Sequence, residues 1–346
     1  MINNPIIINK NTSLKDSLVK LNENPNMQTL LIEDDNKIIG TVTDGDIRRG
    51  LINGLSQNNL ISDFMLTDFT FLTKGKYQPE KLAIIKSKEL KIIPVLNENG
   101  SLFEVLNFNK IKTILPIDAV IMAGGIGSRL MPLTKDTPKP MLEINKKPIM
   151  EYNVDLLQSY GIKNLTLSVK YLKEKIKDYY KNGTDRDMNI SYVTEDEPLG
   201  TIGAVKQIKS FHNDYILVMN SDLLTNINLE EMFDELSSHN ADMIIATTDY
   251  QVQIPYGVVE SNGNQITALK EKPTYTYFSN AGIYIFKRKL IDLIPSHSFF
   301  NATDFLDKLI AENKKVLHYP ITGYWLDIGK HVDFEKAQRD VHSITF

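Results

Sequence analysis

The pattern of apolar and polar positions changes near residue 117. From there to about residue 220, short apolar runs, each suited to a strand buried on both faces, alternate with segments of helical apolar spacing. Pro148 and Gly161 mark the start and the end of the first helical segment. This alternation predicts a largely parallel sheet covered by helices on both faces. The predicted strands are residues 119–122, 165–169, 189–193 and 215–219, and the predicted helices are 148–160, 172–180 and 201–208.

Residues 1 to about 115 show a different pattern, an internal repeat with an offset of 64 positions. Each repeat reads as a helix, a strand, a tight turn and a strand. Leu18 and Leu21 are expected on the buried face of the first helix, and they correspond to Leu82 and Ile85 in the second repeat. Because two such short repeats cannot each bury an apolar face alone, we expect them to pack as one module. The repeats cover residues 9–56 and 63–115, with Asn36 matching Gly100 and Ile38 matching Leu102.

Composition narrows the functional classes. The 346 residues suffice for two domains, which we place at residues 1–115 and 117–346. The formal net charge is −4, whereas proteins that bind nucleic acids or membrane surfaces usually carry a basic excess. No window reaches the ~18 apolar residues of a membrane span. The absence of cysteine excludes disulfides, thiolate metal sites and cysteine nucleophiles. We therefore expect a cytoplasmic enzyme with no membrane and no nucleic-acid partner.

The strand at residues 119–122 runs into a glycine-rich loop. Glycine lets a backbone approach a ligand closely and turn its N–H groups toward an anion, and Arg129 and Lys139 add cations suited to phosphate oxygens. The loop departs from the dinucleotide-binding motif, because Leu130 stands where the third glycine should fall, and it also lacks the P-loop pattern. Taken alone, the loop is compatible with phosphate binding or with a plain tight turn. Its residues are Ala123, Gly124, Gly125, Ile126, Gly127, Ser128 and Arg129.

The segment from this loop to Leu142 resembles the signature of the sugar-1-phosphate nucleotidyltransferases, A-G-G-x-G-x-R-L-x-P-L-T followed by P-K-P-M-L. The resemblance implies an α/β fold with a Rossmann-like, mostly parallel sheet, in which Arg129 and Lys139 neutralise the β- and γ-phosphates of a nucleoside triphosphate. A second segment, residues 197–204, is similar to the family's nucleoside-facing E-P-L-G-T-A-G-A, with Ile202 replacing alanine. The implied nucleotide-binding residues are Ala123, Gly124, Gly125, Gly127, Ser128, Arg129, Lys139, Glu197, Gly200 and Thr201.

Two aspartates are candidates for a metal site. Asp222 follows the predicted strand at residues 215–219, and ligands of open parallel sheets lie at the carboxyl ends of strands. An aspartate in this place can also be a simple helix cap or turn residue. Its N-S-D context and the W-x-D-x-G segment around Asp327 both resemble family motifs. By that resemblance Asp222 and Asp327 together hold Mg²⁺, a hard ion that favours carboxylate and phosphate oxygens.

The sugar side of the site is implied by three further segments that resemble family motifs. By this resemblance Glu271 accepts hydrogen bonds from sugar hydroxyls, Lys272 holds the sugar phosphate, and Asn280 and the Gly257 backbone orient the ring. Without the motif context, Glu271 and Lys272 read as a surface ion pair of little energetic value. The implied catalytic set is Arg129, Lys139, Asp222, Lys272 and Asp327.

The N-terminal repeat resembles a tandem CBS pair, an α+β module that commonly binds adenosine nucleotides between its halves. The resemblance rests on residues 40–47, close to the family's G-h-h-T-x-x-D-h, in which Thr43 contacts phosphate and Asp46 the ribose hydroxyls. The second repeat has Asn107 and Lys110 at the corresponding positions, so the ribose-holding aspartate is missing from one half. Binding of an adenine nucleotide and a purely structural or dimerising role both remain open.

Together the resemblances imply a Mg²⁺-dependent enzyme that joins a nucleoside triphosphate and a sugar-1-phosphate and releases pyrophosphate. The combination looks most like the CBS-bearing glucosamine-1-phosphate guanylyltransferases of legionaminic acid synthesis, which implies GTP and glucosamine-1-phosphate as substrates and a homo-oligomer. Mannose- and heptose-1-phosphate guanylyltransferases are near alternatives, and thymidylyl, uridylyl or cytidylyl transfer stays open. A metal-dependent glycosyltransferase and a non-catalytic nucleotide sensor are the alternatives from other functional classes.

Overall fold

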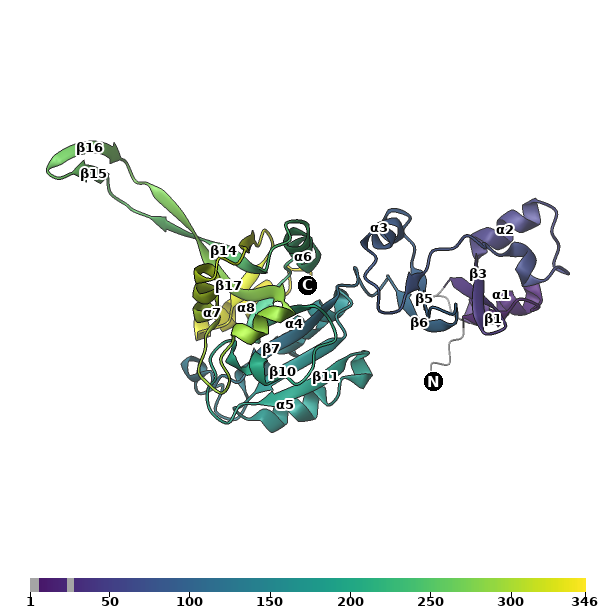
Figure 1. Ribbon diagram of the computed structural model, residues 1–346, viewed down its shortest axis with the longest axis horizontal. Helices are drawn as coiled ribbons and strands as arrows, with labels where there is room; N and C mark the ends of the chain where they lie inside the picture. The colour runs from purple at the N-terminus through teal and green to yellow at the C-terminus, as the bar shows by residue number, and fades with distance from the viewer. Residues whose placement is uncertain (1–5, 24–27) are drawn as a thin grey trace. The chain divides into compact units, whose positions relative to one another are not determined.

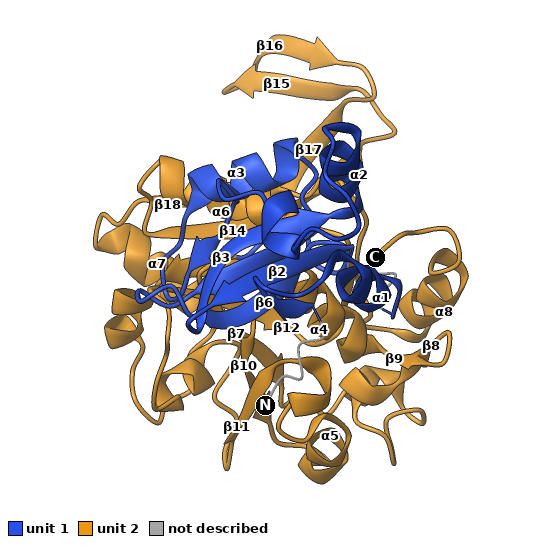
Figure 2. Cartoon of the chain, turned by 90° about the vertical axis from the view of Figure 1, so that its right-hand side faces the viewer, with its two compact units in different colours: residues 1–114 blue, residues 115–346 orange. Residues whose placement is uncertain are grey.

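The computed structural model describes residues 6–23 and 28–346. The chain forms two compact units, residues 1–114 and 115–346 (Figure 2). Among the described residues, no helix combines the length and the apolar content that crossing a membrane requires.

The first unit contains two similar halves, each built on a three-stranded sheet (Figure 1). In each sheet the middle strand pairs in parallel with the first strand and antiparallel with the third. Asn36 and Gly100 occupy the two hairpin turns with φ of 60° and 85°, so the sequence repeat is also a conformational one. The elements are β1 (Ile7–Asn9), α1 (Leu14–Glu23), β2 (Thr29–Asp34), β3 (Lys37–Thr43), α2 (Asp44–Ile52), β4 (Leu72–Thr73), α3 (Pro79–Ser87), β5 (Ile92–Leu96) and β6 (Leu102–Asn107).

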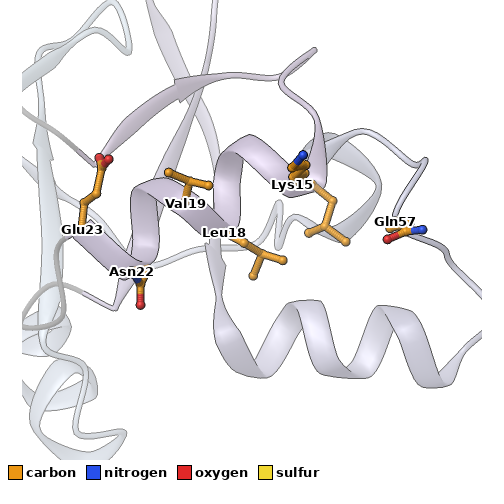
Figure 3. Close-up of a pocket in the computed structure, with 7 residues that line it drawn as sticks. Lys15, Leu18, Val19, Asn22, Glu23 and Gln57 are labelled. Carbon is orange, nitrogen blue, oxygen red and sulfur yellow. The ribbon is translucent and has the colours of Figure 1, made fainter.

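The halves share an apolar core, in which Leu31 and Ile38 from the first half meet Ile92 and Leu96 from the second. The expected helical face needs one correction. Leu18 is 41% exposed, whereas Leu14, Ser17 and Leu21 are buried. Leu18 instead lines a surface pocket along α1 together with its neighbour Val19 and with Gln57 from a later loop (Figure 3).

The second unit is built on a seven-stranded sheet of order β11-β10-β7-β12-β17-β14-β18. Only β17 runs antiparallel to its neighbours, so the prediction of a mostly parallel α/β sheet is confirmed. The large strands are β7 (Ile117–Ala123), β10 (Asn164–Val169), β11 (Asn189–Thr194), β12 (Tyr215–Asn220), β14 (Met243–Gln253), β17 (Thr274–Lys287) and β18 (Val316–Pro320).

Helices cover both faces of this sheet (Figure 1). The side chains of β7 alternate between the two cores, since Ala119 and Ile121 pack with α4, α5 and α6, whereas Val120 packs with α7. The helix predicted at residues 201–208 is instead a short 3₁₀ segment, η5 (Gly203–Gln207). The α-helices are α4 (Ile149–Ser159), α5 (Lys173–Tyr180), α6 (Leu229–Ser238), α7 (Ala302–Ala311) and α8 (His331–Asp340).

The second unit also contains a projecting pair of strands and several short strands and 3₁₀ segments. At one edge of the body, β14 and β17 continue beyond the sheet as a two-stranded ribbon that ends in a hairpin (Figure 1). We call residues 247–280, which form this projection, the arm. The remaining elements are β8 (Glu143–Ile144), β9 (Lys147–Pro148), β13 (Leu223–Thr225), β15 (Val258–Asn262), β16 (Gln265–Lys270), β19 (Trp325–Asp327) and the 3₁₀ segments η2 (Ser128–Leu130), η3 (Lys139–Met141), η4 (Thr184–Arg186) and η6 (Arg288–Leu293).

Candidate active site

The glycine loop lies directly against Lys139. Gly127 adopts φ +69°, and its carbonyl accepts a hydrogen bond of 2.9 Å from the Thr134 hydroxyl. A Cβ at Gly127 would lie 2.9 Å from Lys139 Cβ and 3.0 Å from Thr134 Cγ2, so only glycine fits there. Leu130, at the position of the third glycine in a dinucleotide motif, is fully buried in the core beneath α8. The loop is therefore a packed element that places the Lys139 side chain.

Lys139 itself is buried, with 8% of its surface exposed. It lies in η3 between two prolines, which restrict the local backbone. Its ammonium forms an ion pair with Asp222 Oδ2. A buried lysine needs such a partner, because an unpaired charge in this environment would be costly.

A short antiparallel pair of strands brings the two aspartates together. Leu223 of β13 pairs with Asp327 of β19, and the Ile328 amide donates a 3.0 Å hydrogen bond to the Asp222 carbonyl. Trp325 is partly buried, and its indole N–H donates to the Ala281 carbonyl at 2.9 Å, which ties β19 to the sheet. The sequence motif around Trp325 thus both packs and positions Asp327.

One oxygen of each aspartate has no hydrogen-bond partner among the described residues. These atoms, Asp222 Oδ1 and Asp327 Oδ1, are both buried. Buried carboxylate oxygens are nearly always partnered in proteins, so two free ones on paired segments make this a candidate site for a cation. The described residues contain no cluster of three or more acidic, histidine or cysteine ligands, which means that any cation here would take its remaining ligands from substrate and water.

The electrostatics support the same interpretation. The pKa of Asp327 is raised, first because burial disfavours its charge and then because the negative charge of Asp222 lies nearby. Lys139 and Arg129 oppose this rise. The Arg129 guanidinium lies beside Gly329, where a Cβ would be 3.5 Å from its nearest nitrogen. The structure therefore brings Arg129, Lys139, Asp222 and Asp327 into one site.

The remaining loop residues differ in exposure. Ala123 is buried in the sheet core, so only its backbone is available to a nucleotide. Gly125 and Ser128 are exposed, and a Cβ at Gly125 would meet no atom within 4 Å. The open surface of this loop is consistent with the predicted role in nucleotide binding.

The carboxylate that reaches the glycine loop is Glu195, which the sequence interpretation missed. Glu195 is buried and accepts hydrogen bonds from the Ser168 hydroxyl at 2.5 Å and the Leu199 amide at 3.1 Å. A Cβ at Gly124 would lie 2.9 Å from Glu195 Oε1. Glu197, the predicted nucleotide-binding carboxylate, is exposed on the following loop. The sequence could have indicated Glu195 by its position directly after β11, because the carboxyl end of this strand faces the site.

Gly200 and Thr201 have structural partners. Gly200 adopts φ +77°, and a Cβ there would lie 2.5 Å from the Phe300 carbonyl oxygen. The Thr201 hydroxyl accepts a 2.8 Å hydrogen bond from the Ala302 amide at the start of α7. These residues therefore fasten the loop to α7, a role that the motif did not predict. The Ile202 and Gly203 amides, at the start of the predicted helix, both donate to the Phe300 carbonyl at 3.2 Å.

The predicted sugar residues lie in the arm. A Cβ at Gly257 would lie 3.1 Å from Glu271 Oε2, so these two residues are neighbours where the hairpin of β15 and β16 begins. We call residues 254–273, which include this hairpin, the tip. Lys272 is exposed beside them with φ +43°. Asn280 lies at the base, where its side chain accepts from the Gly282 amide at 2.9 Å and donates to the Tyr284 hydroxyl at 2.8 Å. Because β14 and β17 carry the tip beyond the sheet, the structure does not bring Glu271 or Lys272 to Asp222 within one chain (Figure 1).

In the first unit, Thr43 and Asp46 form the capping box of α2. Asp46 accepts hydrogen bonds from the Thr43 amide and hydroxyl and pairs with Arg49. The second half has Asn107 and Lys110 at the corresponding positions, and no helix follows β6 there. The residues predicted to hold a nucleotide are thus bonded to each other.

The chain belongs to the nucleotidyl transferase family, whose sequence profile matches residues 118–344. The CBS domain profile matches residues 1–53. Among its relatives, a D-glycero-α-D-manno-heptose 1-phosphate guanylyltransferase of Aneurinibacillus thermoaerophilus is 32% identical over 228 residues, covering 65% of this chain and 98% of that protein. A candidate mannose-1-phosphate guanyltransferase of Sulfolobus acidocaldarius is 30% identical over 234 residues, covering 66% of this chain and 64% of that protein.

A solved structure gives the same fold. It is a Bacillus anthracis protein described as a candidate glucose-1-phosphate thymidylyltransferase, with a TM-score of 0.55 and 22% identity. The match covers 66% of this chain and 97% of that one. At this level of identity the likeness supports the fold and not a substrate.

Proposed function

We propose that this chain transfers a nucleotidyl group from a nucleoside triphosphate to a sugar-1-phosphate, with release of pyrophosphate. One observation carries the proposal: two buried carboxylate oxygens, on Asp222 and Asp327, lack partners among the described residues beside Lys139 under the glycine loop. Membership in the nucleotidyl transferase family supports this reaction class. A glycosyltransferase would release a nucleotide and not pyrophosphate.

The residues fit a divalent cation. Asp222 and Asp327 would hold Mg²⁺, whose charge would stabilise the α-phosphate when bound. Two features support this donor set: both ligands are carboxylates with a buried free oxygen, and the pKa of Asp327 is raised, first by burial and then by the negative charge of Asp222. Placing a positive charge between the two aspartates would relieve that repulsion.

In the proposed reaction, an oxygen of the sugar phosphate attacks the α-phosphorus. A new P–O bond forms to the sugar phosphate, and the bond between the α-phosphorus and the oxygen bridging to the β-phosphate breaks with its electron pair. A phosphate monoester is already largely ionised near neutral pH, with a second pKa of about 6, so no general base is needed. We assign to Arg129 and Lys139, which lie beside the two aspartates, the role of offsetting the charge of the departing pyrophosphate.

We infer that the donor is GTP, on the support of the two guanylyltransferase relatives. The nucleotide would lie along the exposed backbone of the glycine loop and the loop of Glu197, Gly200 and Thr201, with Glu195 holding the two loops together. Glucosamine-1-phosphate is the expected acceptor, on the resemblance to the CBS-bearing enzymes of legionaminic acid synthesis. Glu271, Lys272, Asn280 and the Gly257 backbone are its proposed contacts.

We further propose that the first unit binds an adenine nucleotide at Thr43 and Asp46, and that the second repeat is a degenerate CBS unit. In such a complex the ribose hydroxyls would donate to Asp46 Oδ2, the oxygen that now accepts from the Thr43 amide and hydroxyl. Calorimetric titration of the full chain with AMP, ADP and ATP tests this. No heat with any of them, or unchanged binding in Asp46→Ala, would remove the proposal.

A matrix of the four nucleoside triphosphates against glucosamine-, mannose-, heptose- and glucose-1-phosphate, scored by pyrophosphate, tests the main reaction. We expect the largest signal with GTP and glucosamine-1-phosphate in the presence of Mg²⁺. Pyrophosphate from another pair would revise the substrates and keep the reaction class. Transfer of sugar from a nucleotide-sugar to an acceptor, without pyrophosphate, would replace the class.

A further inference from the structure

One face of the arm is apolar, and the other is mostly polar. Residues directly opposite in an antiparallel pair share a face, and successive residues of a strand point to opposite faces. The register pairs Tyr250 with Tyr277 and Val252 with Tyr275, so these four side chains share one face. The opposite face carries the polar side chains of Asp249, Gln251, Gln253, Thr274 and Thr276. Its large apolar side chain, Phe278, pairs with Asp249 near the base, where its ring centroid lies 4.8 Å from that of His318.

Such alternation is typical of a strand that is buried on one side. In the arm that side is uncovered by the described residues, since Tyr250 is 61% and Tyr277 58% exposed. The tip repeats the pattern, because Val259 pairs with Leu269 and these side chains are 51% and 65% exposed. A two-stranded ribbon is marginally stable in water by itself. The arm therefore has the pattern of an element that packs against another surface.

The tip also carries groups that suit a polar ligand. Glu271 lies against Gly257 and next to Leu269, on the face of the exposed apolar pair. The hydrogen bonds and ion pairs that the structure shows for residues 254–273 stay within the arm, as in the pair of Lys270 with Glu260. Lys272 has no ion-pair partner in the described part of the chain. The Lys272 ammonium at the tip and the two unpartnered carboxylate oxygens of the active site carry opposite charges.

We propose that the arm docks onto a second copy of this chain and places Lys272 and Glu271 in the sugar-phosphate site of that copy. The inference rests on the proposed function, because it assigns the sugar contacts of the same active site. The continuous pairing from Thr247 with Asn280 to Gln253 with Thr274 directs the tip away from its own body (Figure 1). The proposed sugar-phosphate site lies beside the glycine loop and the pair of Asp222 and Asp327. Since every copy of this chain has these groups, the tip of one copy can reach them on a second copy. Reciprocal exchange buries both apolar faces in one two-fold interface.

The test is complementation between two inactive full-length variants. One chain carries Asp222→Ala and an intact arm, and the other carries Lys272→Ala and an intact body. The two are produced together with different tags and purified through both tags. In an exchanged dimer, one of the two sites combines the intact Asp222 of one chain with the intact Lys272 of its partner. We expect each variant alone to lose about 100-fold or more in pyrophosphate release, and the mixed dimer to recover about half of the wild-type rate.

The wild-type chain assayed in parallel separates this inference from the proposed function. If the wild type releases no pyrophosphate with any substrate pair, the proposed function fails. If the wild type is active and the mixed dimer is not, arm exchange is overturned, because each arm then serves its own chain. Full activity of Lys272→Ala alone, or failure to recover any doubly tagged species, also overturns it.

A second pair of variants tests the docking face. Tyr250→Ser combined with Tyr277→Ser should abolish complementation and lower the activity of an otherwise wild-type chain. Circular dichroism should show an unchanged fold of each chain, because both side chains are largely exposed within one chain. Ile310→Ser is the control, since Ile310 is 58% exposed on α7 and outside the arm, and it should preserve complementation. Undiminished complementation in the double tyrosine variant would contradict the proposal.

Discussion

Carboxylates near the amino end of β7 and beyond the carboxyl end of β12 have opposite environments. Asp118, near the amino end of β7, is 3% exposed and accepts four hydrogen bonds. Asp222 and Asp327, at the carboxyl end, each keep a buried oxygen without a partner among the described residues. The donors to Asp118 are the amides of His212 and Asn213 and the side chains of Asn213 and Asn164.

Under the proposed function, this difference separates a carboxylate that stabilises the fold from a pair of carboxylates that would bind a cation. A buried carboxylate with all its hydrogen bonds made stabilises the folded state, and removing it leaves buried donors unpaired. A buried pair of carboxylates with free oxygens destabilises the unliganded protein until a cation arrives. The predictions below test this contrast between Asp118 and the pair of Asp222 and Asp327.

The largest effect is expected at Asp222. Asp222→Asn should lower the turnover number about 1,000-fold or more, because it removes one of two charges that hold the cation and the partner of Lys139. Steady-state pyrophosphate release checks this. Circular dichroism should show an unchanged fold, and a near-normal rate with Mg²⁺ would exclude Asp222 from the metal site.

Asp118→Ala should act on stability instead. Losing a fully bonded buried carboxylate should reduce the free energy of unfolding by about 3 kcal/mol, because four donors lose their acceptor. Urea unfolding measures this loss. The turnover number per folded molecule should change little, since Asp118 lies at the end of β7 remote from the glycine loop. A strong loss of turnover with unchanged stability would reverse the assignment.

The neighbouring pair Glu195 and Glu197 provides a matched test of the nucleotide loop. Glu195→Gln should raise the KM for the nucleoside triphosphate about tenfold, because it weakens the charged hydrogen bonds to Ser168 and Leu199 that hold this loop near Gly124. The exposed Glu197→Gln should change the KM about twofold at most. Equal effects of the two substitutions would show that Glu197 contacts the nucleotide directly.

The smallest effect is expected on the stability of the unliganded protein. The pKa of Asp327 is raised in the folded state, mainly by burial and then by Asp222, so the folded state binds its proton more tightly than the unfolded state does. Stability of the wild type should therefore fall as pH rises from about 4 through the folded pKa. Asp327→Asn, which does not titrate, should melt about 2 °C higher than the wild type at pH 7 without Mg²⁺. Saturating Mg²⁺ should reverse the order, and a lower melting temperature of Asp327→Asn at pH 7 without Mg²⁺ would contradict the assignment.

Much of the catalytic unit could be predicted from the sequence, because it depends on local patterns. Buried strands such as β7 and β12 appear as short apolar runs, and the glycine loop follows one of them directly. Asp222 and Asp327 could be paired only through family motifs, since β13 and β19 meet across a long stretch of chain. The strand positions were therefore predicted from local apolar patterns, whereas the pairing of the two aspartates was predicted from family motifs.

What could not be predicted depends on contacts distant in sequence. The hydrogen bonds of Asp118 with His212 and Asn213 join residues more than ninety positions apart, and no sequence pattern near Asp118 predicts them. The choice between Glu195 and Glu197 depends on which side chain turns under Gly124, two positions apart on one loop. The alternation in residues 249–253 indicates a half-buried strand, but the pattern cannot tell which surface covers it.

One measurement tests the central claim most directly: pyrophosphate release by the full chain supplied with GTP, glucosamine-1-phosphate and Mg²⁺, compared with the same mixture containing a chelator and with the Asp222→Asn variant. The account predicts release by the wild type that requires all three components and disappears in both comparisons. Release that persists at the wild-type rate in Asp222→Asn or in the chelator would contradict it.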